Sequence, residues 1–165
     1  MSDRFGVRRA TAADAEALAR QRAEMFREIG GLAEELYAPL VAASRAFYER
    51  AIPAGEYVAW VAVPAERPDE VAASAGVQLR ALMPRPTADG RLAEAPVQGW
   101  IVNVYTEPAW RRGGLAEGLM RELLAWAREA GVDDLVLHTT EDGRPLYERL
   151  GFVPVPYMRF SGEPY

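Results

Sequence analysis

The sequence predicts an α/β domain with a mixed, mostly antiparallel sheet, a parallel strand pair at its centre and about four helices. Three observations support this fold class. Half of the 165 residues are hydrophobic, which suits a single domain over residues 1–165 with a substantial core. Residues 100–106 are rich in aromatic and β-branched residues, as in a buried strand, and an amphipathic helical pattern begins at Leu115. A further apolar run follows at residues 135–140, and two strands joined by a crossover helix lie parallel.

The N-terminal segment predicts one strand and one helix. Residues 5–9 form a short strand-like run. Residues 11–14 have the form Thr-x-x-Asp, which is a helix-start signal related to the capping box. Gly30 and Gly31 end the helical pattern. One face of the predicted helix carries residues at helical spacing: Ala15, Leu18, Arg22, Met25, Phe26 and Ile29.

The next segments predict a broken helix and an antiparallel strand pair. Residues 32–52 have a helical pattern that Pro39 interrupts, so we expect a short piece followed by a longer helix over residues 40–51. Residues 57–63 and 71–83 predict two strands joined by a polar turn.

Two features interrupt regular strand structure in the middle of the chain. Gly76 lies inside the second of these strands and indicates a bulge or a bend. Residues 84–98 contain three prolines and one glycine, which is typical of an exposed connection.

The C-terminal segments predict one strand, one helix and a closing edge. The central helix should end at Gly131. Residues 135–140 then predict a buried strand that turns polar at its end, and residues 144–150 predict a short helix. Residues 152–160 predict one or two closing strands, and the two prolines in this run favour the edge of the sheet.

The composition excludes several kinds of chemistry. The chain contains no cysteine, which removes disulfides, thiolate nucleophiles and cysteine-ligated metals. Its 19 basic residues are all arginine, so no lysine can form a Schiff base or attach pyridoxal phosphate. His138 is the single histidine, and we therefore expect no metal site.

Charge and hydropathy indicate the setting in which the protein acts. The net charge of −5 opposes nucleic-acid binding, which needs a basic surface, and mildly favours a cationic or amine-bearing acceptor. No apolar run approaches the roughly 20 residues of a membrane span, and the N-terminus lacks the apolar core of a signal peptide. We expect a cytoplasmic protein without a nucleic-acid or membrane partner.

A glycine-bearing turn joins the strand at residues 100–106 to the helix that begins at Leu115. Gly113 and Gly114 have no Cβ, so their backbone N–H groups can approach a bulky anion. The unpaired N–H groups at the helix N-terminus add partial positive charge, which suits a pyrophosphate. The alternative is a tight turn that binds nothing, and the local pattern leaves both readings open.

Two motifs resemble a known family. Arg111-x-x-Gly114-x-Ala116 resembles the (Gln/Arg)-x-x-Gly-x-(Gly/Ala) loop of GCN5-related N-acetyltransferases, the acetyl-CoA-dependent family known as GNAT. Residues 145–152 resemble the second signature of the family, (Phe/Leu)-Tyr-x-x-x-Gly-Phe, in the right order and at the usual separation. The resemblance covers residues 99–160, whereas the N-terminal half matches only in the order of its elements. It implies a GNAT-like sheet whose parallel pair splays apart, and acetyl-CoA as acyl donor.

The resemblance also implies where the coenzyme lies. By matching position, Val104, Tyr105 and Thr106 would pair with the pantetheine and the thioester carbonyl. The pyrophosphate would lie against the turn and the first helical residues, mainly through backbone contacts: Arg111, Arg112, Gly113, Gly114, Ala116 and Glu117.

Tyr147 matches the signature tyrosine of the family, which lies near the coenzyme sulfur and can protonate it as a general acid. A phenol suits this role because its pKa is close to that of a thiol. The alternative is a tyrosine packed on a short helix whose hydroxyl is already hydrogen-bonded.

The acceptor pocket and the general base are less well defined. In the family, the region around the first two helices helps to form the acceptor pocket, which makes Met25, Phe26 and Glu28 candidates, along with Glu24 and Tyr37. The alternative is that Met25 and Phe26 belong to the hydrophobic core and that the glutamates are exposed to solvent. Asn103 could position a water molecule but cannot accept a proton.

Two residues remain open as the base. Histidine as a residue type suits a base or a water relay, which makes His138 a candidate, although a lone histidine in a buried strand is more often a hydrogen-bonded core residue. The other candidate is Glu107, a carboxylate beside Pro108 at the end of a strand. This position is also consistent with simple exposure to solvent.

Together these motifs predict an N-acetyltransferase that moves the acetyl group of acetyl-CoA to a primary amine of a small molecule or of a peptide or protein N-terminus. The main alternative is a non-catalytic acyl-CoA-binding or interaction module on the same fold. A dinucleotide-binding unit fits poorly, because Gly113, Gly114 and Gly118 do not form Gly-x-Gly-x-x-Gly. The assembly state stays open, with a homodimer as one candidate.

Overall fold

The computed structural model describes residues 4–87, 89–132 and 134–156. Within them the strands are β1 (Phe5–Arg9), β2 (Tyr57–Pro64), β3 (Ala73–Ala81), β4 (Arg85–Pro86), β5 (Leu92–Ala93), β6 (Val97–Thr106) and β7 (Asp134–Leu137). The α-helices are α1 (Ala15–Glu28), α2 (Tyr37–Ala51), α3 (Leu115–Glu129) and α4 (Arg144–Arg149). Short 3₁₀ turns occupy η1 (Ala12–Asp14), η2 (Glu34–Leu36) and η3 (Pro108–Trp110).

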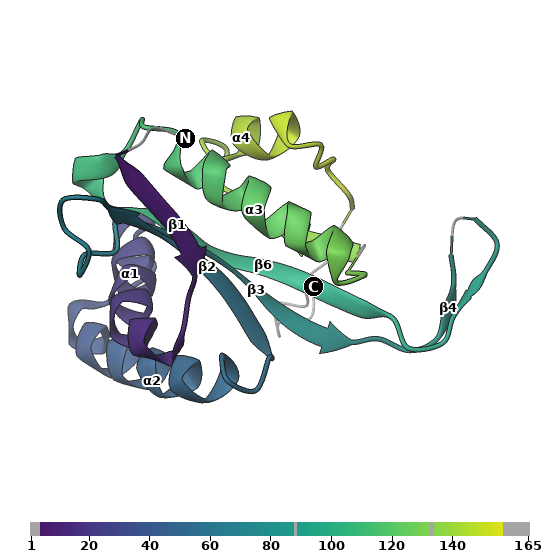
Figure 1. The fold of residues 1–165 in the computed structure, drawn as a ribbon. Helices are drawn as coiled ribbons and strands as arrows, with labels where there is room; N and C mark the ends of the chain where they lie inside the picture. Colours follow the sequence, from purple (N-terminus) through teal and green to yellow (C-terminus); the bar gives the residue numbers. More distant parts are fainter. Residues whose placement is uncertain (1–3, 88, 133, 157–165) are drawn as a thin grey trace, which may run out of the picture.

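The main sheet separates two layers of helices. In the described residues its strands follow the order β1-β2-β3-β6-β7, and every neighbouring pair is antiparallel except β6 and β7. Helices α1 and α2 cover one face, and α3 and α4 cover the other (Figure 1). This arrangement confirms the predicted mixed, mostly antiparallel sheet.

The parallel pair separates partway along β6. Strands β6 and β7 are paired from Gln98 with Asp134 to Ile101 with Leu137. Beyond that point β6 continues to Thr106, and residues 102–106 have no strand partner on this edge among the described residues. The predicted splay is therefore present, and it leaves backbone N–H and C=O groups available for a ligand.

Each face of the sheet has its own hydrophobic core. Leu119 and Leu123 of α3 belong to one cluster, together with Ile101 of β6. Leu18 of α1 and Tyr48 of α2 belong to the other. Full burial of such side chains stabilises the fold by about 1.5–3 kcal/mol each, so both helical layers are held firmly against the strands between them.

A bulge in β6 sets the direction of its side chains. The register with β3 shifts between Ser74 and Gly76, where Asn103 and Val104 together oppose a single residue. Asn103 has a φ of +56°, a left-handed conformation that asparagine tolerates better than most residues. Because of the extra residue, Val102 and Asn103 both face α1 and α2, whereas Val104 packs in the cluster on the α3 face. The irregularity predicted near Gly76 is confirmed, with the extra residue on the partner strand.

The expected break at Pro39 is wrong. Helix α2 begins at Tyr37 and runs through Pro39 without interruption. Pro39 lies in the first helical turn, where a backbone N–H has no partner inside the helix, so the missing donor breaks no bond. The short piece that we expected before the longer helix is η2.

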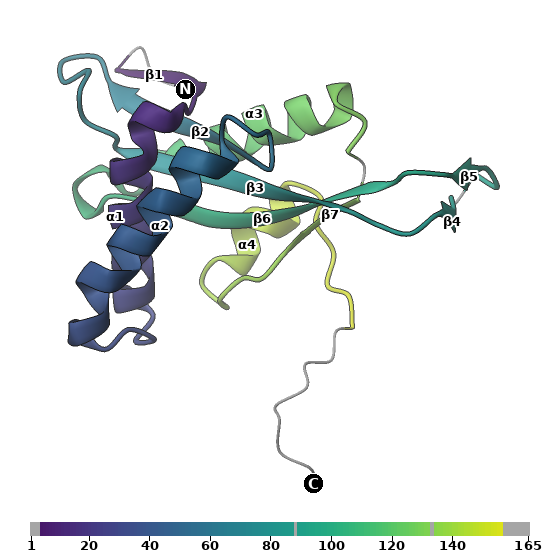
Figure 2. The same cartoon turned by 90° about the horizontal axis from the view of Figure 1, so that it is seen from below.

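The proline-rich connection over residues 84–98 contains structure that the sequence did not indicate. Strands β4 and β5 form a small hairpin within it. Strands β3 and β6 extend past the helices and carry this hairpin away from the rest of the molecule (Figure 2).

The C-terminal expectations need three corrections. Strand β7 covers only Asp134–Leu137 and is half-buried along its length, whereas we expected a buried strand over residues 135–140. Residues 152–156 have no regular structure, and residues 157–160 of the expected closing strands lie outside the described residues. In the described sheet, the parallel pair therefore lies at one end rather than at the centre.

In the parts of the chain that the structure describes, no helix combines the length and the apolar character that crossing a membrane requires.

Candidate active site

A cavity of about 630 Å³ opens where β6 and β7 separate. Helix α1 borders it on one side, and α4 and the segment after β7 border it on the other. Most of the predicted site residues line it: Met25, Phe26, Glu28, Asn103, Val104, Tyr105, Thr106, Arg111, Ala116, His138 and Tyr147. The size is typical of a small-molecule site. Residues from the two halves of the chain therefore meet in one place.

The remaining predicted coenzyme residues lie in the turn before α3 and in the first turn of α3, and they do not line this cavity. They are Arg112, Gly113, Gly114 and Glu117. The Glu117 carboxylate pairs with Arg121 of the next helical turn at 2.7 Å, so the side chain is directed along α3.

The backbone of this turn leaves several N–H groups without a partner among the described residues. Gly114 has a φ of +75° at the start of α3, and Arg112 has a φ of +63°. The backbone N–H groups of residues 112–117 donate no hydrogen bond to any other described residue. Such N–H groups at a helix N-terminus carry partial positive charge and bind phosphate groups. The turn offers the backbone donors that the sequence pattern predicts.

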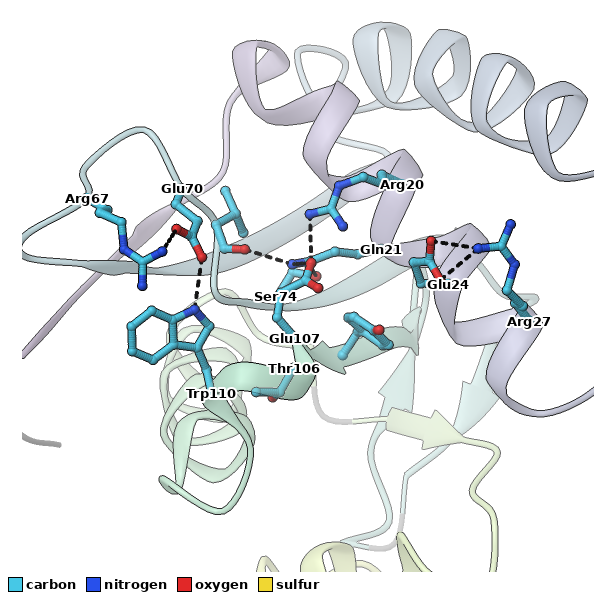
Figure 3. A network of polar contacts seen from close by, with 12 residues as sticks. Arg20, Gln21, Glu24, Arg27, Arg67, Glu70, Ser74, Thr106, Glu107 and Trp110 are labelled. Atoms are coloured by element: carbon cyan, nitrogen blue, oxygen red, sulfur yellow. Dashed lines mark hydrogen bonds and ion pairs between the residues drawn. The ribbon is translucent and has the colours of Figure 1, made fainter.

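A polar network fixes the end of β6 from which the turn starts. Gln21 of α1 is buried, and its amide donates to the Val71 carbonyl and to the Glu107 carboxylate, each at 3.0 Å. Ser74 donates to the Gln21 side-chain oxygen at 2.7 Å, and Arg20 pairs with Glu107 at 2.7 Å (Figure 3). Glu107 is thus a paired structural residue rather than an exposed one, which removes it as a candidate base.

A second cluster joins α1 to the turn. The Arg111 guanidinium donates to both carboxylate oxygens of Glu28, at 2.6 and 2.7 Å, and its Nε donates to the Thr106 carbonyl at 2.9 Å. The Tyr105 hydroxyl donates to Glu28 at 2.8 Å. Partial burial would raise the pKa of Glu28, but the hydrogen bonds from Arg111 and Tyr105 outweigh it and hold this pKa below its usual value. Arg111 and Glu28 therefore line the cavity as a bonded pair.

Tyr147 of α4 lines the cavity. Its ring packs edge-on against Phe152, with centroids 6.0 Å apart, and the hydroxyl has no hydrogen-bond partner among the described residues. Burial raises the pKa of the Tyr147 phenol. The phenol is therefore protonated at neutral pH and has a proton to give.

His138 lies just after β7 and not inside a strand. Its ring stacks on Trp100 with centroids 5.0 Å apart, and it is exposed at the cavity wall. The expectation of a histidine in a buried strand is wrong, because β7 ends one residue earlier, where the parallel pairing stops.

Asn103 borders the cavity, but both the oxygen and the nitrogen of its side-chain amide already make hydrogen bonds within the protein. Its side-chain oxygen accepts from Arg22 at 2.6 Å, and its amide nitrogen donates to the hydroxyls of Tyr48 and Tyr57. Burial raises the pKa of both tyrosines, so they remain neutral. Asn103 thus connects α1, α2 and β2 at the bulge.

Helix α1 borders the side of the cavity where the sequence predicts the acceptor. Met25 and Phe26 contribute apolar wall there. Glu24 and Tyr37 do not line the cavity, since the Tyr37 hydroxyl donates to Glu24 at 2.7 Å and Arg27 lies over the Tyr37 ring.

Among the wall residues that sequence reasoning missed are Arg22 and Trp100. A signal for Arg22 was available, because it is a charged residue on an otherwise apolar helical face. Trp100 gave no such signal, since an aromatic residue in a strand is usually core. Among the described residues, no group of three or more histidine, aspartate or glutamate side chains could hold a metal ion.

Comparisons with known proteins agree with this geometry. A family model described as the acetyltransferase (GNAT) family matches residues 39–152. Glucosamine 6-phosphate N-acetyltransferase of Trypanosoma brucei brucei is 32% identical over 71 residues, which are 43% of this chain and 45% of that protein. The match thus spans less than half of the length of this curated relative.

Two solved structures resemble nearly the whole chain. A GCN5-related N-acetyltransferase from Ralstonia eutropha JMP134 has 30% identity and a TM-score of 0.75, over 94% of this chain and 97% of the other. A predicted acetyltransferase with acetyl-CoA from Clostridium acetobutylicum has 22% identity and a TM-score of 0.76, over 95% and 96% of the two chains. At that identity, the second likeness shows the fold alone. With a family model that covers most of its residues and a 30% identical relative along almost its full length, the chain belongs to the acetyltransferase (GNAT) family.

Proposed function

We propose that this protein transfers the acetyl group of acetyl-CoA directly to the primary amine of a small molecule or of a peptide or protein N-terminus. One observation carries the proposal. The unpaired edge of β6 lines the same cavity as Tyr147, whose hydroxyl has no hydrogen-bond partner among the described residues. The backbone N–H groups of residues 112–117, which donate to no described residue, follow directly after Arg111 at the cavity wall. A diphosphate, an extended amide-bearing arm and a leaving sulfur would need donors and acceptors in this order.

The residues present fit acetyl-CoA, which would supply an acyl group activated as a thioester. The amides of residues 112–117 would bind the diphosphate, and the edge of β6 at Val104 to Thr106 would pair with the pantetheine. Arg111 would act through its contacts with Glu28 and Thr106, which hold the turn against α1 and β6. The side chains here matter less than the backbone that they position.

The chemistry requires two proton movements. The amine must lose a proton to attack the carbonyl carbon; the new C–N bond then forms, the C–S bond breaks, and the sulfur takes up a proton. Tyr147 would supply the proton to the sulfur. His138, exposed at the cavity wall, would take the proton from the amine directly or through a water molecule. Met25 and Phe26 would hold the apolar part of the acceptor.

The acceptor class has independent support from the relatives. The name of the Trypanosoma brucei brucei relative specifies transfer to glucosamine 6-phosphate, which is a primary amine. A solved structure from Arabidopsis thaliana that bears the same activity in its name has a TM-score of 0.67 and 14% identity, and supports the fold only.

The proposal is tested by thiol release from acetyl-CoA in the presence of amino acids, polyamines, aminoglycosides and peptides with free N-termini. Turnover with at least one class is expected. Isothermal titration with acetyl-CoA, run in parallel, separates the alternatives. Tight binding of acetyl-CoA without thiol release for any amine of the panel would overturn the proposed enzymatic activity. It would favour a non-catalytic acyl-CoA-binding module.

A further inference from the structure

The acceptor side of the site continues beyond the main cavity. A second cavity of about 300 Å³ lies against α2, and its wall includes Phe47, Tyr48 and Tyr57. The two cavities share Arg22, Val102 and Asn103. The bulge in β6 makes this junction possible, because it turns Val102 and Asn103 to the same face of the sheet. Arg22 therefore lies where the two cavities share their wall.

Arg22 is a half-buried cation without a carboxylate partner among the described residues. Its Nη1 donates to the Asn103 side-chain oxygen at 2.6 Å, and its guanidinium lies 4.9 Å from the centroid of the Phe26 ring. Other arginines of α1 differ, since Arg20 pairs with Glu107 and Arg27 pairs with Glu24 and Glu34. A guanidinium has five N–H donors, and an amide oxygen neutralises none of its charge.

The neighbouring acids do not compensate this charge. Glu28, the carboxylate that lines the main cavity, is held by Arg111 and Tyr105. Glu24 is held by Arg27 and Tyr37. The cavity end at Arg22 is therefore locally positive although the whole chain carries a charge of −5. Salt screens charges more than about 8 Å apart, so the nearby guanidinium dominates what binds there.

We infer that the acceptor amine carries an oxyanion, a carboxylate or a phosphate, and that Arg22 binds this group at the junction of the two cavities. This inference rests on the proposed acetyl transfer and specifies its substrate class. A guanidinium suits the task because it binds carboxylate and phosphate groups through two parallel N–H···O bonds. With the oxyanion at Arg22, the rest of the acceptor extends along the splayed edge of β6 toward Tyr147, where the amine is needed.

The test compares matched acceptors that differ only in the anionic group. One arm pairs an amino acid with its amide, and the other pairs an amino sugar phosphate with the unphosphorylated amino sugar. We expect the wild-type protein to favour the anionic member of at least one pair by 10-fold or more in kcat/KM. Arg22→Gln should raise KM for that member by about 10- to 100-fold, the range of charge-assisted hydrogen bonds, and change the neutral member by less than about 2-fold.

Two variants separate recognition from a structural role. Arg22→Lys keeps the positive charge but cannot form the bidentate pair of hydrogen bonds. It should therefore retain part of the preference for the anionic acceptor that Arg22→Gln loses. Arg128→Gln makes the same charge change on the exposed end of α3 and should leave the preference intact. If Arg22 only supports Asn103, Arg22→Gln will lower turnover of both members of each pair equally and remove the basis of the inference.

Acceptor binding provides a readout that does not need turnover. Titration of the anionic acceptors into the CoA complex should show binding to the wild type and about 10-fold or greater weakening in Arg22→Gln. Equal turnover of the anionic and neutral members of each pair would overturn the oxyanion site and leave the acetyltransferase proposal standing. Acceptor binding that depends on Arg22 but is never followed by thiol release would support the oxyanion site and overturn the acetyltransferase proposal.

Discussion

Tyr147 shows how a single side chain can carry a step of the proposed chemistry. Its ring is held by Phe152, while its hydroxyl has no hydrogen-bond partner in the described residues. Tyr147→Phe removes one oxygen atom and leaves the packing, so we expect kcat to fall by about 10²-fold and the acetyl-CoA dissociation constant to change by less than about 3-fold. Thiol release at saturating substrates measures the first, and titration measures the second.

Tyr37→Phe is the matched control for this experiment. It removes a hydroxyl that donates to Glu24 away from the cavity, and it should leave kcat unchanged. An unchanged kcat in Tyr147→Phe would remove Tyr147 from the mechanism.

The same phenol sets an expectation for pH dependence. Burial raises the pKa of Tyr147 above its ordinary value near 10, so the hydroxyl keeps its proton throughout the neutral and mildly alkaline range. Loss of this proton should therefore cause no decline in kcat below about pH 10. A kcat profile between about pH 6 and 10 tests this. An alkaline decline well below pH 10 that disappears in Tyr147→Phe would contradict it.

At the scale of elements, the pair of Glu28 and Arg111 joins α1 to the turn before α3. If Arg111 acts through Glu28, Glu28→Gln and Arg111→Gln should each weaken acetyl-CoA binding by a few-fold, and the double variant should be no weaker than either one. The expected coupling is about 0.5–1 kcal/mol, because both side chains are partly exposed. Titration of acetyl-CoA into the wild type, the two single variants and the double variant measures this coupling energy. A direct contact with the coenzyme would instead make Arg111→Gln harmful and Glu28→Gln neutral.

Gly76 limits how β2 and β3 can pack. A Cβ at this position would lie 1.9 Å from the Tyr57 hydroxyl oxygen and 2.3 Å from its ring carbon, and Tyr57 is fully buried. Gly76→Ala should therefore destabilise the fold by about 1–3 kcal/mol, which lowers the melting temperature by about 2–4 °C per kcal/mol. Gly6→Ala in β1, where a Cβ meets nothing within 4 Å, is the control and should change it little. Equal melting temperatures for both variants would show that Tyr57 can move aside.

At the scale of the whole molecule, the proposed coenzyme site draws on the turn before α3, on β6 and on α4. We propose that residues 1–165 form one domain, so thermal unfolding should show one transition, and acetyl-CoA should shift all of it. At 100 times the dissociation constant, the ligand should contribute about 2.7 kcal/mol, a rise of about 5–11 °C. Differential scanning calorimetry measures this. Acetyl-pantetheine, which lacks the diphosphate, should give a smaller shift, and two transitions with only one shifted would contradict a single domain.

The sequence determined the local features of this protein because neighbouring residues decide them. The strand at β6, the glycine turn and α3 follow from β-branched residues, from Gly113 and Gly114, and from an apolar stripe at helical spacing. The two motifs at residues 111–116 and 145–152, in the right order and at the usual separation, together indicated the family. The misplaced break at Pro39 also has a local cause: a proline is harmless in a first helical turn, and the pattern did not reveal where that turn begins.

Only the tertiary structure decided which side chains remain available to a ligand. Arg111 and Glu28 are 83 positions apart in sequence, and their ion pair exists only because α1 packs beside the end of β6. The bonding of Asn103 to Tyr48 likewise depends on how α1, α2 and β6 meet, and so does the lack of a carboxylate partner for Arg22 within the described part of the chain. Spacing along the chain cannot report such contacts, because the bulge in β6 decides which residues share a face, and a shift of one residue reverses the assignment.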